Sequence, residues 1–184
     1  MSADLEIAVG VVLERRAAIS PWADFVWRPS AVLPGEPDAA PGTQLDGDAT
    51  RARFYAGGAT LALHRAETAQ YRDNLATGAP LLWVVLRPSE ATPPFAVHLV
   101  TADPSEGEAH TEAGTELVDT VAMPAAIAQA LAAFVAEHHV EQAFFKRTRT
   151  RSDPQALARR AGGATDGPAT GAKPRGAKSG GPKP

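Results

Sequence analysis

Composition changes abruptly near residue 145, and this break limits which part of the chain can fold. Residues 1–143 carry eight arginines, no lysine and 19 acidic residues, whereas residues 144–184 carry ten basic and two acidic residues. From residue 161 onward there is no aromatic side chain and, apart from proline, no apolar side chain larger than alanine. Such a segment cannot bury enough surface to offset the entropy lost on folding. We therefore predict a single globular domain over residues 1–145 and a disordered basic tail over residues 146–184.

The remaining composition excludes several classes of protein. A chain of 184 residues with 44% hydrophobic residues is long enough for one ordinary domain. The absence of cysteine removes disulfides, thiolate metal ligands, iron–sulfur clusters and cysteine nucleophiles. No window approaches eighteen consecutive apolar residues, and the first twelve residues contain two acids and no base. We expect neither a membrane span nor a signal peptide, and a cytoplasmic location is the default expectation.

Alternating patterns predict a domain built mainly of strands. Residues 6–15 place Ile7, Val9, Val11 and Leu13 on one face, as a half-buried strand does. Two alternating runs flank Gly57-Gly58, and this pair predicts a two-residue hairpin turn. Two further strands follow: residues 81–88 are apolar on both faces, which predicts a central strand, and residues 94–102 alternate again.

Two helices are expected to pack on these strands. Residues 66–76 predict a short helix that ends at Gly78, and residues 124–139 predict a longer one with Ile127, Leu131 and Phe134 on one stripe. The predicted fold class is therefore α+β, with a curved, mostly antiparallel sheet of five or six strands covered by both helices. The connection over residues 34–50 is long, which predicts a mobile or functional loop.

Two of the three tryptophans lie in the proline-rich run of residues 19–35. Pro29 keeps the residue before it out of helical geometry, so residues 27–33 are expected to form an edge strand with irregular pairing. We expect Phe25 and Trp27 to be core residues, because large rings supply much of the burial in a small domain. Trp22 lies in a predicted turn and is the candidate for an exposed contact with a partner.

The search for catalytic signatures returns mainly absences. The chain contains no G-x-S-x-G, H-E-x-x-H or G-x-G-x-x-G pattern. His64, Arg65 and Glu67 lie at a predicted strand-to-helix junction, where a binding or catalytic site would be built if one exists. His138 and His139 are interpreted as a helix C-terminus rather than a metal site, because adjacent helical residues point about 100° apart. We name no catalytic residue, no metal ligand and no cofactor.

A second possible pair of histidines lies within the domain. His64 and His98 lie on predicted strands and would meet only if those strands pair. A partly solvated sheet face is the simpler interpretation of both.

The basic stretch after the domain offers a different kind of site. Lys146, Arg147, Arg149 and Arg151 follow two phenylalanines, a composition suited to phosphate contacts and base stacking. The same stretch could instead dock on an acidic partner or on the acidic domain itself, or could serve only to keep the protein soluble. Nucleic-acid binding is therefore an alternative function.

Five segments together resemble a known bacterial family. They are "VGVVLERR" (9–16), "PWADFVWRPSAVLPG" (21–35), "YAGGATLALHRAETAQYRDNL" (55–75), "LWVVLRP" (82–88) and "HHVEQAFFKRTRTR" (138–151). In this order they are similar to the domain-of-unknown-function family three-three-zero-five. The resemblance brings no catalytic residues. Members of that family are often encoded beside formate dehydrogenase genes, which implies a subunit or maturation factor of a molybdenum or tungsten formate dehydrogenase as the partner.

Three functional hypotheses follow. The favoured one is a non-catalytic accessory or interaction protein for maturation or assembly of such a dehydrogenase. The second is a nucleic-acid-binding protein that uses the basic arm. The third is an enzyme built around His64, Arg65 and Glu67, and the missing motifs count against it.

Overall fold

The computed structural model describes residues 3–111 and 114–140. The secondary-structure elements follow one another in the order β1 (Leu5–Ala17), β2 (Phe25–Pro34), β3 (Gln44–Gly47), β4 (Arg51–Leu63), a 3₁₀ turn η1 (Arg65–Glu67), α1 (Thr68–Ala76), β5 (Leu81–Pro88), β6 (Phe95–Thr101), α2 (Pro104–Ala109), β7 (Leu117–Ala122) and α3 (Ala125–His138). The predicted tail over residues 146–184 lies outside the described residues.

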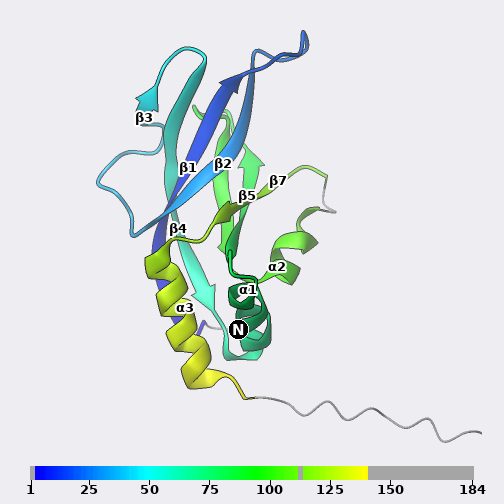
Figure 1. The fold of residues 1–184 in the computed structure, drawn as a ribbon. Coiled ribbons are helices and arrows are strands. Elements are labelled where there is room, and N and C mark those ends of the chain that lie inside the picture. The colour runs from blue at the N-terminus through cyan, green and yellow to red at the C-terminus, as the bar shows by residue number, and fades with distance from the viewer. Residues whose placement is uncertain (1–2, 112–113, 141–184) are drawn as a thin grey trace, which may run out of the picture. The chain divides into compact units, whose positions relative to one another are not determined.

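The strands form two antiparallel sheets (Figure 1). The order of strands is β2-β1-β4-β3 in the first sheet and β6-β5-β7 in the second. The predicted α+β class, the antiparallel pairing and the C-terminal helix are confirmed. The strands divide between two sheets of four and three, where the sequence indicated one sheet of five or six. β5 is central in its sheet and β2 is an edge strand with a register shift, as expected.

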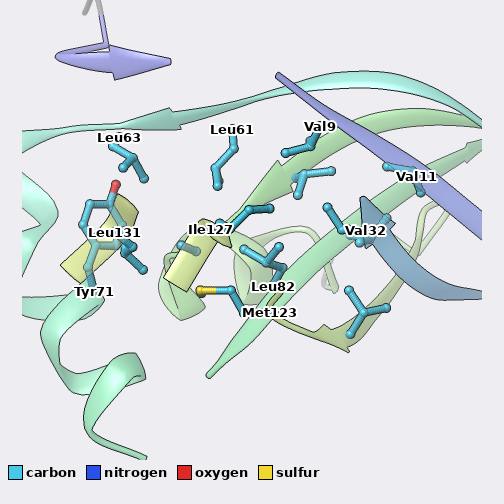
Figure 2. Packing of buried hydrophobic residues seen from close by; sticks show 14 of the residues in the cluster. Val9, Val11, Val32, Leu61, Leu63, Tyr71, Leu82, Met123, Ile127 and Leu131 are labelled. Carbon is cyan, nitrogen blue, oxygen red and sulfur yellow. The ribbon is translucent and has the colours of Figure 1, made fainter. Parts of the chain in front are cut away.

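The core lies between the inward faces of the two sheets, and helices α1 and α3 contribute to it at one end (Figure 2). Val9, Val11 and Leu13 of β1 are completely buried there, which confirms the predicted apolar face. From the opposite sheet, Leu82 of β5 packs into the same cluster. Burying each such side chain contributes about 1.5–3 kcal/mol to folding.

The predicted hairpin turn at Gly57-Gly58 is wrong, because β4 runs without interruption from Arg51 to Leu63. Gly57 has φ +136°, a conformation that side-chain-bearing residues rarely adopt. The register with β1 shifts at this point, where Val11 pairs with Gly57 and Val12 with Tyr55. The glycine therefore serves a β-bulge within one long strand.

The two predicted helices are present. The first begins as η1 and continues as α1, and Gly78 follows its end with φ +76°. In α3, the residues Ile127, Leu131 and Phe134 are buried, which confirms the predicted stripe. Both helices lie at the end of β4 that leads into η1 (Figure 1).

The long connection over residues 34–50 packs on the outer face of the first sheet. It contains the edge strand β3, which pairs with β4. Gly10 allows the chain to pack closely here, because a Cβ atom on it would lie 2.8 Å from the Pro37 side chain. Asp48 closes the turn into β4 by accepting hydrogen bonds from Thr50 and from the backbone N–H of Arg51, and these bonds lower its pKa to about 2.

Candidate functional site

A row of charged residues crosses all four strands of the first sheet near the end farthest from α1 and α3. Glu14 of β1 lies directly opposite Arg28 of β2 and Arg53 of β4, and Arg53 lies opposite Asp46 of β3. The charges alternate along the row, which favours this pairing register. Arg53 and Asp46 also form an ion pair at the surface.

Glu14 is the buried centre of this row, since its side chain is only 2% exposed. Arg28 donates to Oε1 from Nε and Nη2 at 3.3 and 3.2 Å, and Arg51 Nε donates to Oε2 at 2.7 Å. Arg16 forms a further ion pair with Oε1. Burial opposes ionisation of Glu14, but the hydrogen bonds from Arg51 and Arg16 outweigh it and hold its pKa below the ordinary 4.5.

We call Arg16, Arg28 and Arg51 the arginine cluster. Three guanidinium groups share the single carboxylate of Glu14, so this network carries two excess positive charges. The three arginine side chains are 48–60% exposed, and their outer edges therefore face solvent. Arg28 and Arg51 also line a cavity of about 360 Å³ together with Asp119 at the edge of β7. The cluster can accept an anionic group while Glu14 holds the guanidiniums in place.

Large apolar side chains are exposed in the hairpin that joins β1 to β2, directly beyond the arginine cluster. Ile19 is fully exposed and Trp22 is 92% exposed, and Val26, which pairs with Arg16, is 55% exposed. We call Ile19, Trp22 and Val26 the hairpin tip. Trp22 therefore lies at the surface, as the predicted contact with a partner would require.

The expectation that both Phe25 and Trp27 are core residues is half right. Trp27 packs against the core, with its ring centroid 5.2 Å from that of Phe54. Phe25 is 39% exposed, so its assignment to the core is wrong. The guanidinium of Arg15 lies 4.4 Å from the centre of its ring and covers one face by a cation–π contact. At this end of the first sheet, the Arg15 side chain covers the Phe25 ring in place of apolar side chains of the core.

The structure separates the predicted trio of His64, Arg65 and Glu67. His64 and Glu67 line a cavity of about 470 Å³, whose other lining residues are Tyr71, Asp103, Ser105 and Glu106. Arg65 turns away from it and donates to Asp4 from Nε at 2.8 Å. The carboxylates of Glu67, Asp103 and Glu106 therefore line this cavity, whereas Arg65, the arginine of the predicted trio, does not. The cavity suits a cationic ligand better than an anionic one.

Tyr71 belongs to the framework of this cavity. Its hydroxyl accepts a hydrogen bond from the backbone N–H of His64 at 3.2 Å. Burial raises the pKa of Tyr71 to about 12, and the neighbouring carboxylates act in the same direction. The phenol therefore stays protonated at neutral pH and does not act as a base there.

His98 and His139 lie in different surroundings. The condition for a pair of His64 and His98 is not met, because β4, which ends just before His64, and β6, which carries His98, belong to different sheets and do not pair. The ring of His98 lies instead beside that of His110, with centroids 5.5 Å apart. His139 ends α3 as expected, and its ring nitrogens contact Thr68 Oγ1 and Arg72 Nη1, each at 3.1 Å. Since the guanidinium can only donate, Nε2 accepts and Nδ1 carries the hydrogen.

The remaining predicted site residues, Lys146, Arg147, Arg149 and Arg151, lie outside the described residues. The arginine cluster was not predicted, although two of its members each stand two positions from another charged residue. Arg16 lies two residues after Glu14, and Arg51 two residues before Arg53. That spacing places each pair on one face of a strand, which is the signal that could have indicated the cluster.

These features define an α+β protein of two antiparallel sheets with a charged face and an exposed apolar hairpin. The chain belongs to the family described as "Protein of unknown function (DUF3305)", which matches residues 8–149. The resemblance noted in the sequence is therefore confirmed. No curated protein and no solved structure matches the chain. Within the described residues, no helix is long and apolar enough to cross a membrane.

Proposed function

We propose that this protein is a non-catalytic accessory protein that binds a partner protein through the hairpin tip and the arginine cluster. The observation that carries the proposal is the exposure of Trp22 and Ile19 at the end of a hairpin, with no side chain over either one. Tryptophan and arginine are the residue types that most often dominate the energy of protein interfaces. Here both types lie together at one end of one sheet.

The chemistry of the surface indicates the chemistry of the partner. Apolar side chains at the centre of an interface are covered by apolar groups, whereas charged residues at its rim meet opposite charges. The hairpin tip would enter an apolar pocket, and the two excess positive charges of the arginine cluster would face aspartate or glutamate side chains around it. We therefore expect an acidic protein surface as the partner.

The resemblance to proteins encoded beside formate dehydrogenase genes supplies the candidate partners. We propose a subunit or a maturation factor of a molybdenum or tungsten formate dehydrogenase, with the present protein acting in its maturation or assembly. The absence of the common catalytic signatures from the sequence supports a role in binding. This part of the proposal rests on the resemblance, and the surface chemistry is compatible with it.

The test is a pull-down with the full chain from cells that express the dehydrogenase gene cluster. We expect the wild-type protein to retain a dehydrogenase subunit or maturation factor, and Trp22→Ala to reduce retention at least about tenfold. Trp22→Ala should leave the thermal midpoint unchanged, because the side chain makes little contact with the fold. Val140→Ala is the matched control, since Val140 is 78% exposed after α3, and it should bind like the wild type.

Recovery of no such subunit would reject the dehydrogenase partner. Equal retention by Trp22→Ala and the wild type would reject the hairpin tip as the binding surface.

Nucleic-acid binding is the second candidate. It rests on Lys146, Arg147, Arg149 and Arg151. The exposed Trp22, at the same end of the sheet as the arginine cluster, favours it as well, since bases stack on aromatic rings and guanidiniums bind phosphates. The excess of acidic residues in the domain counts against it. The test compares retention of DNA and RNA at low salt by the full chain and by a chain that ends at residue 145. If the two chains retain nucleic acid equally, the basic arm is not the binding element.

A further inference from the structure

We propose that His98, His110 and Glu116 form a site for one divalent transition-metal ion of the zinc type. The three residues come from different parts of the fold: His98 from β6, His110 from the end of α2, and Glu116 from the residue before β7. One nitrogen or oxygen atom of each side chain lies within 4.8 Å of the corresponding atoms of the other two. Across residues 3–111 and 114–140, no other three histidines or carboxylates converge in this way.

The geometry is close to what such an ion requires. Four ligands at about 2.1 Å from a tetrahedral ion lie about 3.4 Å from one another. His110 Nδ1 and Glu116 Oε2 are already 2.6 Å apart, and the rings of His98 and His110 meet at 75°. A small rotation of the exposed His98 side chain toward the other two residues therefore brings the three donors around one centre. Because His98 is exposed, a fourth position faces water.

A neighbouring arginine holds the carboxylate in place. Arg87 of β5 donates from Nε to Glu116 Oε1 at 2.6 Å, and the Glu116 side chain is only 6% exposed. This contact occupies one carboxylate oxygen and leaves Oε2 directed at His110. Hydrogen bonds of this kind orient metal ligands in many proteins. A neutral His110 ring that binds the ion through Nδ1 carries its hydrogen on Nε2.

The donor set selects the kind of ion. Two imidazole nitrogens and one carboxylate oxygen match zinc and its neighbours in the first transition row, and three protein ligands with one open position are typical of reactive zinc sites. Calcium and magnesium prefer oxygen ligands throughout. A purely structural ion pair among Arg87, Glu116 and His110 would need no contribution from His98, so His98 distinguishes the two interpretations.

The experiment is a calorimetric titration of the full, untagged chain with zinc chloride, followed by titration with cobalt(II) monitored by visible absorption. We expect one ion per chain with a dissociation constant in the micromolar range or below, and visible bands of tetrahedral cobalt. His98→Ala should weaken binding at least about tenfold. His138→Ala is the matched control, because it removes a histidine of α3 that belongs neither to this group nor to the cavity lined by His64, and it should bind zinc like the wild type.

Two results would overturn the proposal: no saturable binding of zinc, or equal affinity of His98→Ala and the wild type. His98 is exposed, so its replacement should not impair folding. Glu116→Gln gives an independent check, since it should weaken zinc binding as His98→Ala does. Unchanged zinc affinity in a folded Glu116→Gln protein would also reject the site.

Discussion

Replacing Glu14 with glutamine removes the one carboxylate that Arg16, Arg28 and Arg51 share. Glutamine has nearly the same shape, so the packing of β1 is preserved. Its amide presents one acceptor oxygen and one donor group, and the donor would face a guanidinium that can only donate. The substitution therefore leaves three like charges near one another and a buried polar group without a suitable partner.

The size of the effect follows from the burial of each partner. An exposed ion pair contributes at most about 1 kcal/mol, whereas removing one member of a fully buried pair costs about 3–5 kcal/mol. Here the Glu14 carboxylate is buried but the guanidiniums are about half exposed and can regain water. We therefore expect Glu14→Gln to lower the free energy of unfolding by about 2–3 kcal/mol, which corresponds to a fall of roughly 6–10 °C in the thermal midpoint.

The assay is urea unfolding at neutral pH, with Glu6→Gln as the matched control. Glu6 lies on the same strand and is exposed, so its replacement changes the net charge equally but should leave stability nearly unchanged. A Glu14→Gln protein as stable as Glu6→Gln would refute the reasoning.

The pH dependence of the same variant provides a second check. The pKa of Glu14 is lower in the folded protein than the ordinary 4.5, so the folded state favours the ionised form. Its stabilising effect is complete above the pKa of the unfolded chain and disappears as the pH falls through the folded pKa. The difference in stability between the wild type and Glu14→Gln should therefore shrink on acidification below about pH 4.5. A difference that stays constant from pH 7 to pH 3 would show that the charge of Glu14 is not the cause.

Three further outcomes are expected. Asn74→Ala should lower the free energy of unfolding in urea by about 2–4 kcal/mol. The buried Asn74 amide donates to two backbone carbonyls at 2.8 and 2.9 Å and accepts from Leu81 N–H at 3.0 Å. A decrease below about 1 kcal/mol would contradict this prediction. Gly107→Ala should lower the free energy of unfolding by about 1–3 kcal/mol, because the added Cβ would lie 2.3–2.5 Å from atoms of Trp83. Unchanged stability would contradict this and show that α2 can shift away from Trp83. Asp48→Ala should lower the free energy of unfolding at neutral pH, and this effect should disappear as the pH falls through about 2, the folded pKa of Asp48. An effect that persists in full at that pH would argue against the turn hydrogen bonds as its cause.

Much of the strand structure could be predicted because its signal is local. The alternation in β1 and the apolar run in β5 each reflect which side of a strand meets the core, and the residues record this directly. β3 was not expected as a strand because its four residues are all exposed, and an edge strand of that kind carries no apolar alternation.

The interpretation of Gly57-Gly58 failed for a different reason. A tight turn and a β-bulge both need a residue with positive φ, so a glycine pair is compatible with either. The length of the neighbouring strand decides between them: β1 is 13 residues long and pairs with β4 on both sides of the glycines. Nothing near the glycines in the sequence carries that information.

The candidate sites also differ in how much of them the local sequence could indicate. Exposure of Trp22 could be anticipated, because it lies between Pro21 and Ala23-Asp24 in a predicted turn, outside any alternating pattern. Alternating charged residues within two strands were a partial signal for the arginine cluster, but the meeting of Arg28 and Arg51 at Glu14 depends on strand register. The meeting of His98, His110 and Glu116 depends on which segments lie together, and no local pattern records this.

The sequence by itself determined the α+β class, the buried face of β1, the two main helices and membership of the family, because each depends on patterns within a few neighbouring residues or on residues shared along the chain. Only the tertiary structure decided that the strands form two sheets, that three arginines share Glu14, and that His98 lies beside His110. The physical reason is that pairing between distant strands is set by the packing of the whole core, whereas periodicity is set by the geometry of a single strand or helix.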